Sequence, residues 1–139
     1  MDDAAKIREG IHPSGKIILA IHVIKGEAIP DFEPYIPYIN AIVLDSFNKS
    51  SGQAGGTGKI HDWEKSAEIV RRTKLPVILA GGLNPQNVAE AIRTVHPFGV
   101  DANSGLKDKN RACSKELCSA FVREAKKAFL TPSNHAAKM

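Results

Sequence analysis

The stretch Pro76-Val-Ile-Leu-Ala-Gly-Gly-Leu-Asn-Pro85 decides the fold class, together with Gly99-Val-Asp-Ala-Asn-Ser-Gly105 further along the chain. Each stretch predicts a strand that ends in a glycine-rich turn, and a helical segment lies between them. In a parallel sheet, both turns would lie side by side at the carboxyl ends of their strands. In βα-barrel proteins such turns bind phosphate through exposed backbone N–H groups backed by a helix N-terminus. The expected phosphate-binding residues are Gly81, Gly82, Ser104 and Gly105.

The pattern of a buried strand followed by a helix repeats along the chain. Nearly continuous apolar runs are typical of parallel strands that are covered on both faces. Strands are expected at 17–24, 41–45, 76–80 and, more weakly, 98–102. Helices are expected at 62–73, from Asn84-Pro85 onward and after the capping residue Ser114, with a short or broken helix at 31–40. This alternation predicts parallel strands joined by right-handed crossovers.

The length of the chain limits how many such units it can hold. A closed eight-stranded barrel typically needs about 250 residues, and this chain has 139. We therefore expect one α/β domain over residues 1–139, made of four parallel βα units that form half of a TIM (β/α)8 barrel. Residues 1–15 are expected to be the remnant of a further helix, and 131–139 a disordered tail.

Composition excludes several classes of function. The net charge is only +4, and the basic residues are scattered among acidic ones, so we expect no nucleic-acid partner. No apolar run reaches the ~18 residues of a membrane span, and the N-terminus lacks the features of a signal peptide. Cys113 and Cys118 are five apart on the expected last helix, a spacing of neither a zinc site nor a redox pair. A cytoplasmic protein without metal or cofactor is expected.

Four segments together resemble the phosphoribosylanthranilate isomerase family, specifically the C-terminal half of its barrel. They occur in the family's order and cover most of residues 16–130. They are Ile42-Val-Leu-Asp-Ser46, Gly55-Gly-Thr-Gly-Lys-Ile-His-Asp-Trp63, Leu79-Ala-Gly-Gly-Leu-Asn-Pro-Gln-Asn-Val88 and Pro97-Phe-Gly-Val-Asp-Ala-Asn-Ser-Gly105. The resemblance implies strands 5–8 of the barrel and an isomerase of tryptophan biosynthesis. Its reaction would be the Amadori rearrangement of N-(5-phosphoribosyl)anthranilate, a phosphorylated sugar-like ligand.

Asp45 is the candidate catalytic residue. A carboxylate at the C-terminal end of a barrel strand is typical of a catalytic residue. The alternative is that it accepts hydrogen bonds from backbone amides of the next loop. The resemblance implies that Asp45 is the general acid that protonates the ribose ring oxygen. It also places Asp101 near the sugar or the anthranilate; a buried structural pairing is the alternative.

The polar loop 46–61 and the histidines complete the candidate set. The loop could close over the substrate, or be a plain surface connection. Its expected mobile residues are Gly55, Gly56, Thr57, Gly58 and Lys59. His22 lies in an apolar strand, and we expect it to be a core histidine.

The chain departs from the family in one respect. The family's catalytic base is a cysteine on the first barrel strand, within a Lys-Ile-Cys-Gly type segment, and this chain has no such segment. Four strands also leave two open edges, which invite pairing. We therefore expect a homodimer, or a complementary half-barrel chain that supplies the missing units. The alternative is a non-catalytic phosphosugar-binding or assembly module.

Overall fold

The computed structural model describes residues 2–48, 53–54 and 62–131. The predicted strands and helices are present in the predicted order, with shifted ends. The elements are α1 (Asp2–Gly10), β1 (Ile18–Val23), the 3-10 helix η1 (Glu33–Tyr38), β2 (Ala41–Asn48), β3 (Gln53–Ala54), α2 (Trp63–Arg72), β4 (Val77–Leu79), α3 (Val88–Val95), β5 (Gly99–Val100), the 3-10 helix η2 (Ser104–Leu106) and α4 (Lys115–Leu130).

The four predicted strands form one parallel sheet in the order β1-β2-β4-β5. Its order follows the chain, as right-handed βα crossovers between neighbouring strands would arrange it. β3 pairs antiparallel with the end of β2, Phe47 opposite Ala54 and Asn48 opposite Gln53. The pairing with β3 extends β2 to Asn48, beyond the part that pairs with the parallel strands. Residues 46–48 of the expected loop 46–61 therefore belong to a strand.

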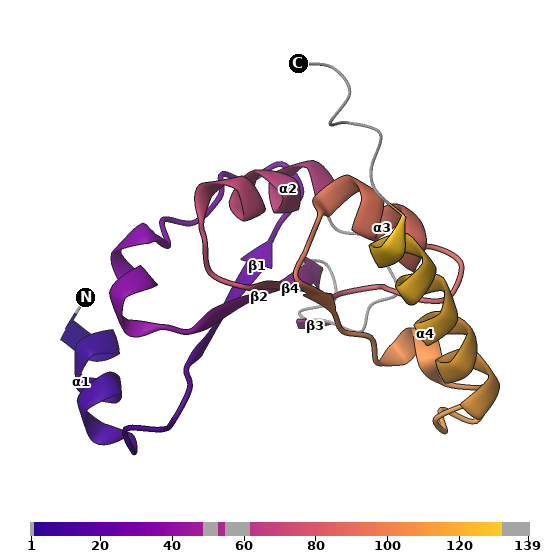
Figure 1. Cartoon of the computed structure of the whole chain (residues 1–139), viewed down its shortest axis with the longest axis horizontal. Coiled ribbons are helices and arrows are strands. Elements are labelled where there is room, and N and C mark those ends of the chain that lie inside the picture. Colours follow the sequence, from indigo (N-terminus) through magenta and orange to yellow (C-terminus); the bar gives the residue numbers. More distant parts are fainter. Residues whose placement is uncertain (1, 49–52, 55–61, 132–139) are drawn as a thin grey trace.

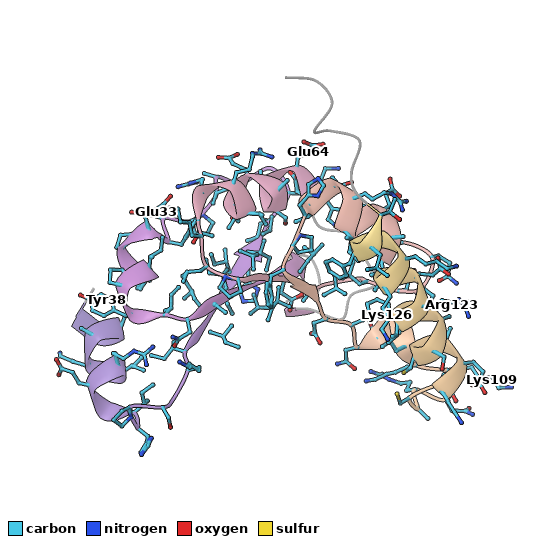
Figure 2. All side chains as sticks on the ribbon, viewed as in Figure 1. Glu33, Tyr38, Glu64, Lys109, Arg123 and Lys126 are labelled. Carbon is cyan, nitrogen blue, oxygen red and sulfur yellow. The ribbon has the colours of Figure 1, made fainter. Side chains whose placement is uncertain are left out.

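The helices cover one face of the sheet. Figure 1 shows an arch, with α2, α3 and α4 along its outside and the strands beneath them. Alternate strand residues such as Ile42, Leu44 and Leu79 are fully buried against this helical layer. Charged side chains occupy the outer surface, and Glu64 points from α2 away from the sheet (Figure 2). The pattern is that of parallel strands with helices packed on them.

The other face of the sheet is open in the described part of the chain. Along β1, exposed residues alternate with more buried ones. Ile18 is 54% exposed although it is a large apolar residue, and Ala20 and His22 on the same side are exposed as well. His22 is thus not the core histidine that the apolar strand suggested, because only one face of the strand is covered. None of the described helices is long and apolar enough to cross a membrane.

Side-chain caps explain where the helices begin. Asp62 accepts a hydrogen bond from the Lys65 amide at 3.2 Å, and Ser114 accepts one from the Leu117 amide at 3.3 Å. The start of α3 differs from the expectation: its first regular residue is Val88, not Pro85. Residues 85–87 form a turn instead.

Arg8 fixes the N-terminal segment to the edge of the sheet. Its guanidinium donates hydrogen bonds to the Tyr38 carbonyl at 2.9 and 3.1 Å and to the Gly15 carbonyl at 3.0 Å. It also donates to Asn40 Oδ1 at 2.6 Å, and the same oxygen accepts the Ile17 amide at 2.8 Å. α1, η1 and the entry to β1 therefore share one hydrogen-bond network.

Candidate functional site

Asp45 lies on the open face, near the carboxyl end of the sheet. Ile42 and Leu44 on β2 are buried against the helices, and side chains alternate along a strand, so Asp45 faces the other way. It is half-buried. The register pairs it with His22 on β1, which brings the imidazole and the carboxyl group to neighbouring positions on the same face.

Asp101 lies at the same end of the sheet, two strands away. Its amide donates to the Leu79 carbonyl at 2.9 Å, and the Ala80 amide donates to the Leu44 carbonyl at 2.7 Å. The ladder thus continues past the strand ends and sets Ala80 between Asp45 and Asp101. Asp101 is exposed in the described structure, so it is not part of a buried pair there.

The first glycine turn is a left-handed bend that side chains rarely allow. Gly81 has a φ of 86° and Gly82 a φ of 67°, values that favour glycine. Two asparagines hold the bend in place: Asn87 Nδ2 donates to the Gly82 carbonyl at 2.9 Å, and the Asn84 amide donates to Asn87 Oδ1 at 2.9 Å. Asn84 Oδ1 in turn accepts the Asn87 amide at 3.1 Å.

This reciprocal pair forms a hydrogen-bonded turn directly before α3. The Val88 amide donates to the Asn84 carbonyl at 3.1 Å, so the turn leads into the regular helix that begins at Val88. Sequence reasoning identified Asn84 and missed the role of Asn87. The signal was available, because a polar residue three positions after an N-cap is the spacing of a reciprocal cap.

The second glycine turn lies directly against the first. A methyl group at position 105 would overlap the Leu83 carbonyl and lie 2.9 Å from Cβ of Asn84. Only glycine permits this approach of the two backbones. Ser104 and Gly105 open η2 and are half-buried. The structure therefore sets Gly105 against Leu83 and Asn84, the two residues that follow Gly81 and Gly82. A phosphate site at Gly81, Gly82, Ser104 and Gly105 stays a prediction.

The loop after β1 is tied to α2 by a lysine that sequence reasoning missed. Lys65 Nζ donates to the Ile24 carbonyl at 3.2 Å and to the Glu27 carbonyl. Its carboxylate partner Asp62 is 3.9 Å away. A lysine on a helix surface carries no sequence signal for such a contact, since most such side chains are solvated.

The predicted mobile residues Gly55, Gly56, Thr57, Gly58 and Lys59 lie outside the described residues. Across the described ranges, no three His, Cys, Asp or Glu residues are grouped so that they could hold a metal ion.

The site combines two chemical capacities at one end of the sheet. The touching glycine turns place backbone close to any ligand above them, and backbone amides in such turns suit an anion. Two carboxyl groups and an imidazole stand on the adjoining open face, where they can exchange protons with a bound molecule. An anionic substrate that needs proton transfer fits this arrangement.

Sequence comparison identifies relatives. A sequence profile for N-(5'phosphoribosyl)anthranilate (PRA) isomerase matches residues 15–123, a range that holds every candidate site residue named above. N-(5'-phosphoribosyl)anthranilate isomerase 2 of Methanosarcina mazei is 44% identical over 122 residues, which are 88% of this chain and 54% of that protein. The isomerase of Haloarcula marismortui is 36% identical over 132 residues, 91% of this chain and 61% of that protein.

The fold is similar to solved structures of isomerases from the same family. The phosphoribosyl anthranilate isomerase of Thermotoga maritima has a TM-score of 0.65 at 30% identity, over 91% of this chain and 57% of that one. A family structure in complex with reduced 1-(o-carboxyphenylamino)-1-deoxyribulose 5-phosphate has a TM-score of 0.61 at 29% identity, over 91% and 54%. The chain thus spans little more than half the length of these relatives. Profile, relatives and fold agree that this chain belongs to the N-(5'-phosphoribosyl)anthranilate isomerase family.

Proposed function

We propose that this chain supplies the phosphate-binding and proton-donating half of a phosphoribosylanthranilate isomerase. Its four βα units correspond to strands 5–8 of the family barrel. The substrate is N-(5-phosphoribosyl)anthranilate, which the enzyme rearranges from an aminoribose to an aminodeoxyribulose phosphate in the cytoplasm. The observation that carries the proposal is the contact between two glycine turns beside the carboxyl groups, in a chain of this family.

The substrate phosphate binds at the glycine turns. Gly81 and Gly82 adopt left-handed φ values, and Gly105 has no side chain to hold the two turns apart. A phosphate above the turns can accept hydrogen bonds from the backbone, and Ser104 adds a hydroxyl donor. The contact between the turns fixes the spacing of these donors before the ligand arrives, which lowers the entropic cost of binding.

Asp45 acts as the general acid. It stands on the open face near the carboxyl end of β2, with His22 at the paired position on β1. A substrate held by its phosphate at the end of β4 and β5 extends over this face, with its sugar toward Asp45. Proton transfer from the Asp45 carboxyl to the ribose ring oxygen opens the ring. Asp101, exposed on the same side, contacts the sugar or the anthranilate.

Further βα units cover the open face and provide the base that removes the sugar C2 proton. The apolar residue Ile18 on the edge strand β1 is 54% exposed. Burying this exposed part would stabilise an assembly by ~0.8–1.6 kcal/mol, about half the value for a fully exposed isoleucine. A second copy of the chain or a complementary half-barrel chain supplies these units. The solved relatives are long enough to contain such units, because the matched part of this chain covers only 57% and 54% of their length.

The test follows substrate consumption by fluorescence. The purified chain is assayed alone over a range of concentrations, and mixed with the segment of the Thermotoga maritima isomerase that it does not match. We expect turnover when the second half is present, and a loss of about 10²–10⁴-fold with Asp45→Asn. Asp31→Asn, an exposed carboxylate on the loop before η1, serves as the matched control and should retain full turnover.

Binding and turnover separate the alternatives. Phosphate binding without turnover in any mixture would favour a non-catalytic phosphosugar-binding module. Turnover that survives Asp45→Asn would overturn the role of the acid, and failure to bind phosphate would overturn the site as a whole.

A further inference from the structure

Cys113 and Cys118 meet at the start of α4. Their Sγ atoms are 3.4 Å apart, and both are free thiols, Cys113 exposed and Cys118 half-buried. They are the only two cysteines in the sequence. Neither takes part in the proposed activity.

The geometry of the helix cap sets this proximity. Ser114 is the N-cap of α4, with its hydroxyl accepting the Leu117 amide and its carbonyl accepting the Cys118 amide at 2.9 Å. Cys113 is therefore the residue before the cap and Cys118 the fourth residue of the helix. Side chains at these two positions pack against each other in the hydrophobic staple. The helix cap therefore places the two cysteines at positions whose side chains face each other.

Cys113 is also held from the other side. It forms an antiparallel bridge with Lys107, and the Ser114 amide donates to the Leu106 carbonyl at 2.8 Å. Leu106 ends η2, which carries Ser104 and Gly105. The segment that presents Cys113 is thus anchored both to α4 and to the second glycine turn.

We propose that Cys113 and Cys118 are a reversible modification site that forms an intramolecular disulfide by exchange with a small-molecule disulfide such as oxidised glutathione. The Sγ atoms need to approach from 3.4 Å to about 2.05 Å, a change within reach of side-chain rotation. Such a bond would join the residue before the cap to the first turn of α4.

The exchange proceeds in two balanced steps. The Cys113 thiolate attacks one sulfur of the glutathione disulfide, whose S–S bond breaks and releases one glutathione thiolate. The Cys118 thiolate then attacks Cys113 Sγ, and the mixed disulfide breaks to release the second. Two protons pass to the leaving thiolates, and two electrons reduce the glutathione. Cys113 attacks first because it is the exposed thiol. The hydrogen bond between the two thiols raises the pKa of Cys118, so Cys118 is the less reactive thiol at the first step.

In the test, the full chain is equilibrated with mixtures of reduced and oxidised glutathione. The remaining thiols are then blocked with iodoacetamide, and the intact mass is measured by mass spectrometry. We expect a monomer that has lost two hydrogen atoms and carries neither glutathione nor acetamide. The single variants Cys113→Ser and Cys118→Ser should instead carry one glutathione each. Mixed disulfides on both cysteines of the unchanged chain, or disulfide-linked dimers, would overturn the proposal.

A second measurement isolates the role of the fold. The same titration in concentrated urea keeps the sequence spacing and removes the helix cap. We expect the folded chain to form the internal disulfide at a ratio of oxidised to reduced glutathione at least tenfold lower than the unfolded chain. Equal ratios would show that the cap does not bring the thiols together, and would refute the inference.

Discussion

Replacing Gly105 with alanine tests whether the two glycine turns depend on their close contact. The added Cβ would lie 2.9 Å from Cβ of Asn84, about 0.6 Å closer than the ~3.5 Å at which carbon atoms pack. It would also overlap the backbone carbonyl of Leu83, which cannot rotate away. Leu83 is buried and Asn84 is held by Asn87, so the turns must separate.

We expect Gly105→Ala to lower the free energy of unfolding by about 1–3 kcal/mol, the usual cost of overpacking. Binding of inorganic phosphate should weaken by about tenfold or more, since a shift worth ~1.4 kcal/mol suffices. Urea denaturation measures the first quantity and titration calorimetry the second.

Gly10→Ala is the matched control. Gly10 is the last residue of α1, and a Cβ there would meet nothing within 4 Å. Alanine in a helix is favoured over glycine by about 0.5–1 kcal/mol, so this variant should be slightly more stable. If Gly105→Ala had the same stability and phosphate affinity as Gly10→Ala, the contact between the turns would contribute neither to the free energy of unfolding nor to phosphate binding. If only stability fell, the turns would be structural and the phosphate site would lie elsewhere.

Three further changes test separate parts of the molecule. Ser114→Ala removes the hydroxyl that accepts the Leu117 amide, and should cost about 1 kcal/mol of unfolding free energy in a urea titration. Arg8→Met removes the network at the edge of β1; a loss of about 1–3 kcal/mol is expected, and an unchanged midpoint would contradict it. Glu33 has a pKa below its ordinary 4.5 because it bonds its own backbone amide and then Arg72. The contribution of Glu33 to the free energy of unfolding is therefore fully present above pH 4.5, and it is lost as the pH falls through the lower pKa of the folded state. Glu33→Gln should flatten the decline in thermal midpoint between about pH 5 and pH 3, and a decline of unchanged steepness would refute the linkage.

The order and type of the main elements could be predicted because their signals are local. A continuous apolar run predicts a parallel strand, and Asp62 and Ser114 are recognisable caps. The glycine turns were predictable for the same reason, since left-handed backbone at Gly81 and Gly82 favours the one residue without a side chain.

The features that escaped prediction depend on pairs of residues. The reciprocal cap between Asn84 and Asn87 needs both side chains, whereas Asn84-Pro85 alone predicts a helix that begins at Pro85. The sequence pattern places both cysteines on one helix, where a spacing of five would separate their side chains. Cys113 instead lies before the cap, and this places its sulfur against Cys118. A shift of one residue across a helix boundary thus changes which side chains meet.

The largest difference concerns the strands rather than the helices. The apolar run at 17–24 is the signature of a strand with both faces covered, yet Ile18, Ala20 and His22 are exposed in the described structure. The apolar pattern of β1 differs from its observed burial only on the face that points away from the helices. On the helical face, every second residue from Ile21 onward is buried, so the assignment as a parallel strand is sound. An exposed isoleucine on the other face is consistent with the proposal that a second layer covers that face. The same argument applies to His22, which the apolar run predicts as a core histidine and which is exposed on this face. It is expected where a covered face is also the lining of a site, next to Asp45 on the neighbouring strand.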